Sequence, residues 1–185
     1  MTEAKKKKKN GQIILGAEMF ERDNQQSLNS YLAGKIDAKN LKDSVRLWKN
    51  YETDYRPLVD FAKDKKLGFI ATNVPRKYAS QTSKQGIKSL EQLPESLMGD
   101  HVDEMKLMNF ISAQAIKDAT MAESIFNNLQ SGKTFIHYNG DYHSKQYGGI
   151  YWYLKKKNPN LKIAVISVFE SEKPELSLPE KDFIP

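Results

Sequence analysis

Four short apolar runs alternate with longer segments whose apolar residues recur at helical spacing. The runs cover residues 12–17, 67–72, 133–138 and 161–169 and are rich in β-branched and aromatic side chains, which is typical of buried strands. A strand, a helix and another strand in succession favour parallel pairing. The pattern therefore predicts an α/β fold, with a mostly parallel central sheet flanked by helices.

The segments between the runs have the end signals of helices. Asp23 or Asn24 can cap the first helix, which Gly34 ends. Pro57 suits the first turn of the third helix, where a missing N–H costs nothing. The expected helices span residues 24–32, 37–50, 54–66, 76–85, 101–130 and 144–157.

The remaining segments do not change the expectation of a single α/β domain over residues 1–185. Residues 1–10 form a lysine-rich lead, residues 89–100 an irregular connection and residues 171–185 an extended tail. At this length, one domain can bury a sizeable core.

Composition excludes several classes of function. The net charge is +6, but much of it comes from the lysine run at residues 5–9, so we do not expect a nucleic-acid partner. The absence of cysteine excludes disulfides, zinc–thiolate sites and cysteine nucleophiles. No apolar run is long enough to span a membrane, and the N-terminus lacks the apolar core of a signal peptide.

Polar side chains follow three of the predicted strands. Glu18 comes just after the first strand, Asn73 and Arg76 follow the second, and His143 stands in the turn after the third. Because the carboxyl ends of parallel strands meet at one edge of a sheet, we expect these groups to gather in one crevice. Each also has an ordinary structural explanation, as a helix-capping carboxylate, a turn-capping amide, a solvated guanidinium or a packed imidazole.

The turn at residues 139–143 is where we expect the functional site. It contains Tyr142 and His143, and Tyr147 follows closely. Tyrosine and histidine are both axial ligands of haem iron in known proteins. His137, inside the preceding strand, is expected to be packed and hydrogen-bonded rather than a ligand.

Gln114 and Asp118 lie one turn apart in the longest predicted helix and so share a face. They can point into the site or form a structural network. Other chemistries lack their motifs, because the pair Gly148-Gly149 is too short for a phosphate loop and neither a Gly-x-Ser-x-Gly elbow nor a His-Glu-x-x-His zinc site occurs.

Six segments carry short motifs, at residues 16–25, 55–62, 71–76, 113–122, 139–143 and 148–150. Each motif alone is weakly specific, but their order is fairly specific. In this order they resemble the motifs of the ChaN-like haem-binding lipoproteins, a bacterial iron-regulated family.

The resemblance implies an α/β fold, haem as a cofactor and a link to bacterial iron or haem uptake. It also implies a homodimer that can hold two haems face to face, and a place in the bacterial cell envelope through a lipid anchor. Arg76 can then pair with a haem propionate, and Tyr142 or Tyr147 can supply the iron ligand. The positions that match the family's site are Glu18, Asn73, Arg76, Gln114, Asp118 and His143.

An enzyme is the alternative that the resemblance leaves open. The family lies near erythromycin-esterase-like and metalloprotease-like proteins, so Glu18 and His143 could serve a metal-dependent hydrolase. The chain lacks the Gly-Glu-x-His strand with which members usually begin, and it lacks the lipobox cysteine. We therefore expect a truncated or shortened sequence, favour a binding protein over an enzyme, and expect membrane association only through an anchor that these residues do not supply.

Overall fold

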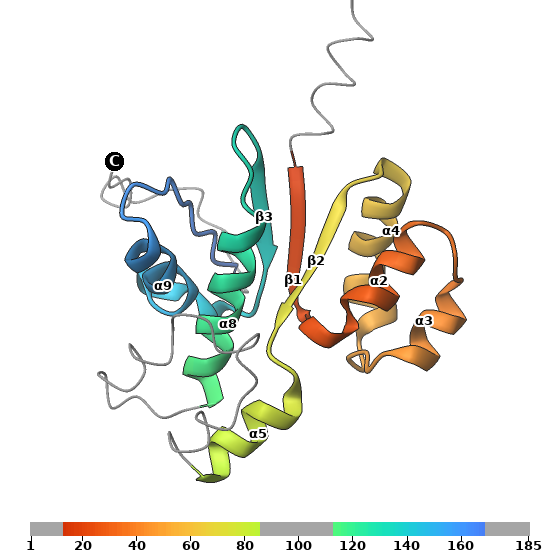
Figure 1. Cartoon of the computed structure of the whole chain (residues 1–185), viewed down its shortest axis with the longest axis horizontal. Coiled ribbons are helices and arrows are strands. Elements are labelled where there is room, and N and C mark those ends of the chain that lie inside the picture. The colour runs from red at the N-terminus through yellow and green to blue at the C-terminus, as the bar shows by residue number, and fades with distance from the viewer. Residues whose placement is uncertain (1–12, 86–112, 169–185) are drawn as a thin grey trace, which may run out of the picture.

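The computed structural model describes residues 13–85 and 113–168, and within them a parallel sheet forms the centre of the molecule (Figure 1). Its strands are β1 (Ile13–Glu21), β2 (Gly68–Asn73) and β3 (Thr134–Tyr138), in the order β2-β1-β3. Both neighbours run parallel to β1. The carboxyl ends of all three strands therefore lie at one edge, the lower edge in Figure 1. This arrangement confirms the predicted fold class.

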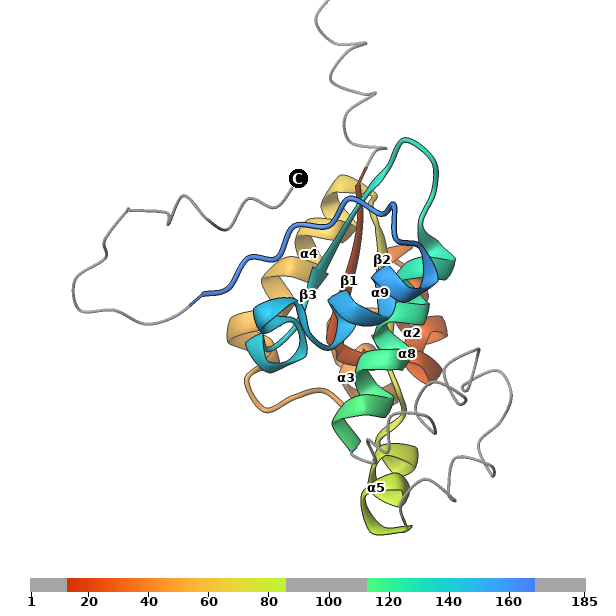
Figure 2. The ribbon, with the colours of Figure 1, turned by 90° about the vertical axis from the view of Figure 1, so that its left-hand side faces the viewer.

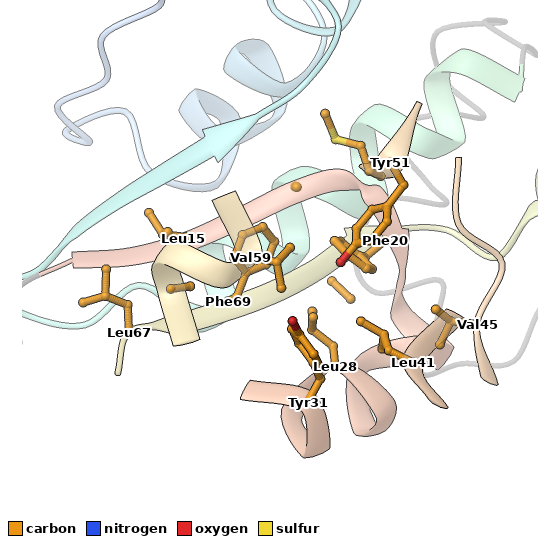
Figure 3. Close-up of a cluster of buried hydrophobic side chains, with 14 residues drawn as sticks. Leu15, Phe20, Leu28, Tyr31, Leu41, Val45, Tyr51, Val59, Leu67 and Phe69 are labelled. Atoms are coloured by element: carbon orange, nitrogen blue, oxygen red, sulfur yellow. The ribbon is translucent and has the colours of Figure 1, made fainter. Parts of the chain in front are cut away.

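One face of the sheet is covered by α2 (Gln25–Leu32), α3 (Ala38–Ser44) and α4 (Arg56–Lys65) (Figure 1). Phe20 lies at the centre of this core, with the rings of Tyr51 and Phe69 packed edge-on against it (Figure 3). Pro57 lies in the first turn of α4, as predicted.

The opposite face is covered by α8 (Ala113–Asn128) and α9 (Ile150–Lys157), which lie in front of the sheet in Figure 2. α5 (Arg76–Gln85) packs against α8 beyond the end of β2. Arg22 fastens the end of β1 to α8, because its guanidinium donates hydrogen bonds to Ser124 Oγ at 2.7 Å and to Glu123 Oε2 at 2.8 Å. The sheet is thus enclosed between two helical layers.

Two predicted element ends were wrong, those of β1 and α3. β1 continues to Glu21, so Glu18 lies inside the strand rather than just past its end. Met19 and Phe20 are buried and carry the strand onward, past a register shift between Ala17 and Glu21. The helix predicted to reach residue 50 ends at Ser44, because the backbone after it is extended.

The predicted helix over residues 144–157 begins only at Ile150. Two short 3-10 turns, Asp141–His143 and Lys145–Tyr147, occupy the preceding segment. The physical reason is a backbone with positive φ at Gln146, Tyr147 and Gly149, which a right-handed helix cannot contain.

The prediction of a fourth strand at residues 161–169 was also wrong for residues 161–168, the part that the structure describes. Residues 161–168 form no strand, and Leu161 and Ile163 instead pack against the core beneath α8 and α9. The predicted segments 1–10, 89–100 and 171–185, like residues 101–112 of the longest predicted helix, lie outside the described residues. None of the helices described is long and apolar enough to cross a membrane.

Candidate functional site

Glu18, Asp118 and His143 meet as a buried cluster of charged side chains at the carboxyl edge of the sheet. The Nε2–H group of His143 donates a hydrogen bond to Glu18 Oε1 at 3.1 Å, and its Nδ1–H group donates to Asp118 Oδ1. All three residues are buried. An acid and an imidazole predicted from distant parts of the sequence thus lie in direct contact, together with a second acid.

The elements bring these side chains together for simple geometric reasons. Successive side chains of a strand point to opposite faces, so Gly16 and Glu18 of β1 share the face that α8 covers. Gly16 leaves room there for the ring of Phe135, because a Cβ atom at this position would lie 2.7 Å from it. Gln114 and Asp118 lie one turn apart on α8 and both reach His143.

The cluster also fastens the backbone of the turn after β3, which is the cyan segment beside α9 in Figure 2. Glu18 Oε2 accepts a hydrogen bond from the N–H group of Gly140 at 2.9 Å. Asn139 Nδ2 donates to Ser144 Oγ at 3.0 Å across the same turn. One carboxylate of β1 therefore holds the turn at two points, at Gly140 and at His143.

The charges of the cluster support one another. Burial by itself lowers the pKa of His143, but hydrogen bonds to Asp118 and Glu18 and the charges of both outweigh it and raise the pKa from 6.5 to about 9. Burial acts to raise the pKa of Glu18, yet hydrogen bonds from His143 and Gly140 hold it below its usual value. Burial raises the pKa of Asp118, which His143 only partly offsets. His143 is thus an imidazolium between two acids at neutral pH.

Stability is expected to depend on pH through this imidazolium. Because the pKa of His143 is about 9 in the folded protein and near 6.5 when unfolded, its contribution is complete below pH 6.5 and is lost as pH rises through 9. Urea unfolding between pH 6 and pH 10 measures this loss. The His143→Gln variant is the control, since it lacks the titrating group. An equal decline of the free energy of unfolding in both proteins contradicts the assignment.

His137 takes part in a separate, neutral network, as predicted for a packed histidine. Its Nδ1–H group donates to Asn139 Oδ1 at 2.9 Å, and its Nε2 accepts a hydrogen bond from the Thr72 hydroxyl at 2.8 Å. Desolvation lowers the pKa of His137 to about 4. The ring therefore ties β3 to β2 without carrying a charge.

Asn73 and Arg76 lie at the same edge of the sheet but have different roles. Asn73 is buried, and its Nδ2 group donates to the backbone oxygen of Glu18 at 3.0 Å. Arg76 is exposed at the start of α5, where its backbone N–H donates to Glu21 Oε2. In the described part of the chain, no ion pair joins its guanidinium to the buried cluster. Asn73 thus belongs to the predicted cluster of polar groups, whereas the Arg76 guanidinium forms no ion pair with it among the described residues.

The two tyrosines of the turn differ in how open they are. Tyr142 is 78% exposed, and Lys145 Nζ lies 3.6 Å from the centroid of its ring. Tyr147 is 40% exposed and packs on Tyr151, with ring centroids 5.0 Å apart. Both nitrogens of His143, which lies between these tyrosines in sequence, are engaged by carboxylates. Tyr142 is therefore the more open of the two tyrosines, and His143 has no nitrogen left for iron.

The turn holds its shape against local strain. Gln146 and Tyr147 have φ values of 54° and 58°, a left-handed conformation that costs a residue with a Cβ atom roughly 1–2 kcal/mol. Strain of this kind persists only where surrounding contacts over-determine the backbone, and it is concentrated at functional sites. The bonds to Glu18 and Asp118 supply that constraint.

Two features of the turn were not predicted from the sequence, namely the position of Lys145 over the Tyr142 ring and the hydrogen bond from the Gly140 N–H group to Glu18. The signal for Gly140 was present as a turn-forming Asn-Gly pair, but which carboxylate it would meet depends on the fold. In the residues that the structure describes, no group of three or more His, Asp or Glu side chains has an arrangement that could hold a metal ion.

Comparisons with known proteins agree with this fold and extend it. A family model described as "Haem-binding uptake, Tiki superfamily, ChaN" matches residues 1–98 and 91–154. The solved structure of ChaN from Campylobacter jejuni, which shows cofacial haem binding, has a TM-score of 0.56 at 16% identity over 82% of this chain and 66% of that one. Protein RETICULATA-RELATED 5, a chloroplastic protein of Arabidopsis thaliana, is 30% identical over 87 residues. Those residues are 46% of this chain but 12% of that relative.

Proposed function

This chain belongs to the haem-binding ChaN family of the Tiki superfamily, whose model matches most of its length, and from that premise we propose that it binds haem at the turn after β3. The family match is the observation that carries the proposal. The exposed phenol of Tyr142 in this turn supports the choice of this place for the ligand. Tyrosine oxygen is a known ligand of haem iron, so Tyr142 is the residue that would hold the iron.

The residues of the site divide into two groups in this proposal. Tyr142, exposed on the surface of the turn, would hold the iron through its phenol oxygen. Glu18, Asp118 and His143 lie beneath and hold the turn in position through buried hydrogen bonds. His143, predicted from the sequence as a haem contact, is therefore assigned a positioning role.

A homodimer and a role in uptake extend the proposal. The ChaN protein of Campylobacter jejuni binds haem cofacially. Because Tyr142 is exposed on the surface, a second copy of this chain could cover the haem that it binds. We expect haem to shift this chain from monomer to dimer in light-scattering measurements. Haem or iron uptake in a bacterial cell envelope, with a lipid anchor supplied from outside these residues, remains a prediction.

The alternative of a metal-dependent hydrolase has less support. Such an enzyme needs His143 or Glu18 to face a metal or a water molecule, whereas these two side chains are buried and bonded to each other. The described residues also supply no group that could hold the metal. We therefore favour binding over catalysis.

Titration with hemin tests the proposal. The protein is expected to give a saturable Soret shift, and the Tyr142→Phe variant to bind at least about tenfold more weakly, a difference of about 1.4 kcal/mol. Tyr147→Phe is the matched control, because it removes a hydroxyl from the same turn and is expected to bind normally. If the unmodified protein gives a response that does not saturate and equals that of an unrelated control protein in the same buffer, haem binding is ruled out.

A further inference from the structure

Lys145 lies directly beside the proposed iron ligand and has no assigned role. We propose that Lys145 determines the specificity of the site by binding a carboxylate of the ligand, so that the site selects a porphyrin with free propionates. This inference rests on the proposed haem function and adds to it the part of the ligand that is recognised. It also replaces Arg76, the residue that the sequence suggested for the propionate.

The position of the ammonium group carries the inference. Lys145 Nζ lies 3.6 Å from the centroid of the Tyr142 ring, so the cation is held next to the phenol that faces solvent. An ammonium over an aromatic face is attracted by the ring, but at an exposed site this interaction is weak. The charge therefore stays available for an anion that approaches Tyr142.

Lys145 is not ion-paired among the described residues, not even with Asp141 of the same turn. Within residues 13–85 and 113–168, Lys145 forms no ion pair with a carboxylate, whereas the two acids nearest to the turn in the core, Glu18 and Asp118, are both bonded to His143. Lysine suits a carboxylate as a compact point charge with rotatable donors. A ligand that carries carboxylates and binds at Tyr142 would thus lie beside a cation that has no ion-pair partner among the described residues.

The backbone of the turn fixes this arrangement. The left-handed residues Gln146 and Tyr147 reverse the chain directly after Lys145. This reversal lets Tyr147 pack on Tyr151 of α9 while Lys145 stays over Tyr142. The pair of phenol and ammonium is therefore part of a constrained turn rather than two independent surface side chains.

Other cations of the region fit the role less well. Lys155 lies near Tyr151, but its Nζ group donates hydrogen bonds to the backbone oxygens of Pro159 at 3.0 Å and Leu161 at 2.8 Å. Arg76 lies at the start of α5, and no hydrogen bond or cation–π contact joins it to Tyr142 among the described residues. Lys145 is the cation that the fold places against the phenol.

The test compares two ligands and two matched variants of the full chain. Haem and its dimethyl ester, which lacks free carboxylates, are titrated in the same dilute detergent into the unmodified protein, Lys145→Gln and Arg76→Gln. We expect Lys145→Gln to weaken haem binding by about three- to tenfold and to leave binding of the ester unchanged. Arg76→Gln, which also removes one exposed cation, is expected to bind both ligands like the unmodified protein.

The outcomes separate this inference from the haem proposal itself. Equal losses of haem and ester in Lys145→Gln would place the effect in the orientation of Tyr142 and overturn the inference, as would unchanged haem binding in that variant. A loss confined to Arg76→Gln would assign the carboxylate to Arg76 instead. If the unmodified protein binds neither ligand, the haem proposal fails. Urea unfolding of both variants confirms that each is folded.

Discussion

Replacement of His143 with alanine is expected to lower the free energy of unfolding at pH 7 by roughly 3–5 kcal/mol, the usual cost of removing one partner from a buried ionic cluster. The imidazolium is the only group that bonds to both Glu18 Oε1 and Asp118 Oδ1 in the described structure. Without it, two buried carboxylates face each other with no cation between them. Urea denaturation followed by circular dichroism measures the change.

The double variant His143→Ala with Asp118→Asn provides the control. It removes the Asp118 carboxylate, one of the two buried acids that lose their cation, so it is expected to recover part of the lost stability. The single variant should also regain stability relative to the unmodified protein as pH falls and the carboxylates take up protons. A loss below about 1 kcal/mol, or no recovery in the double variant, would show that the cluster does not stabilise the fold.

The sequence predicted the sheet because strand signals are local. The runs that contain β1, β2 and β3 show apolar, β-branched residues bounded by turn formers, and parallel order follows from the helices between them. The same signal failed for residues 161–168, because an apolar run does not reveal whether it will pair with a strand or pack against a core. Leu161 and Ile163 pack against the core instead of pairing with a strand.

The site could be predicted only in part, for a similar reason. The sequence placed Glu18 and His143 near one edge of the sheet, since parallel topology alone brings strand ends together. It could not show that Asp118 would be the second partner of His143, because helix periodicity gives a face but not what the face contacts. The bonds that result use both imidazole nitrogens, which changes His143 from a candidate ligand to a support.

This arrangement separates stability from binding within a few residues. Tyr142 and His143 are neighbours in sequence, yet one side chain is open to solvent and the other is buried. A ligand-binding group on the surface needs a fixed backbone beneath it, and packing together with supporting hydrogen bonds provides that fixation. We expect changes below the turn to affect unfolding and binding together, whereas changes at Tyr142 are expected to affect binding alone.

Replacement of Gly149 with alanine is expected to cost at least about 2 kcal/mol of stability, because backbone conformations reserved for glycine cost roughly 1–3 kcal/mol for other residues. Gly149 has a φ of 51° and a ψ of −124°, the values of the glycine position in a type II′ turn. A Cβ atom there would also lie 2.3 Å from the backbone oxygen of His143 and 3.0 Å from Asp118 Oδ2. The turn must therefore move away from α8.

Gly148→Ala is the matched control for this prediction, since it makes the same chemical change one residue earlier. Gly148 has a φ of −87°, and its added Cβ would lie 3.4 Å from the Lys145 oxygen, a contact that small shifts accommodate. We expect Gly148→Ala to unfold within about 1 kcal/mol of the unmodified protein and to bind haem normally. Gly149→Ala should lose affinity as well as stability, because displacing His143 moves Tyr142 with it. Equal behaviour of the two variants would mean that the close approach of Gly149 to His143 does not hold the binding turn in place.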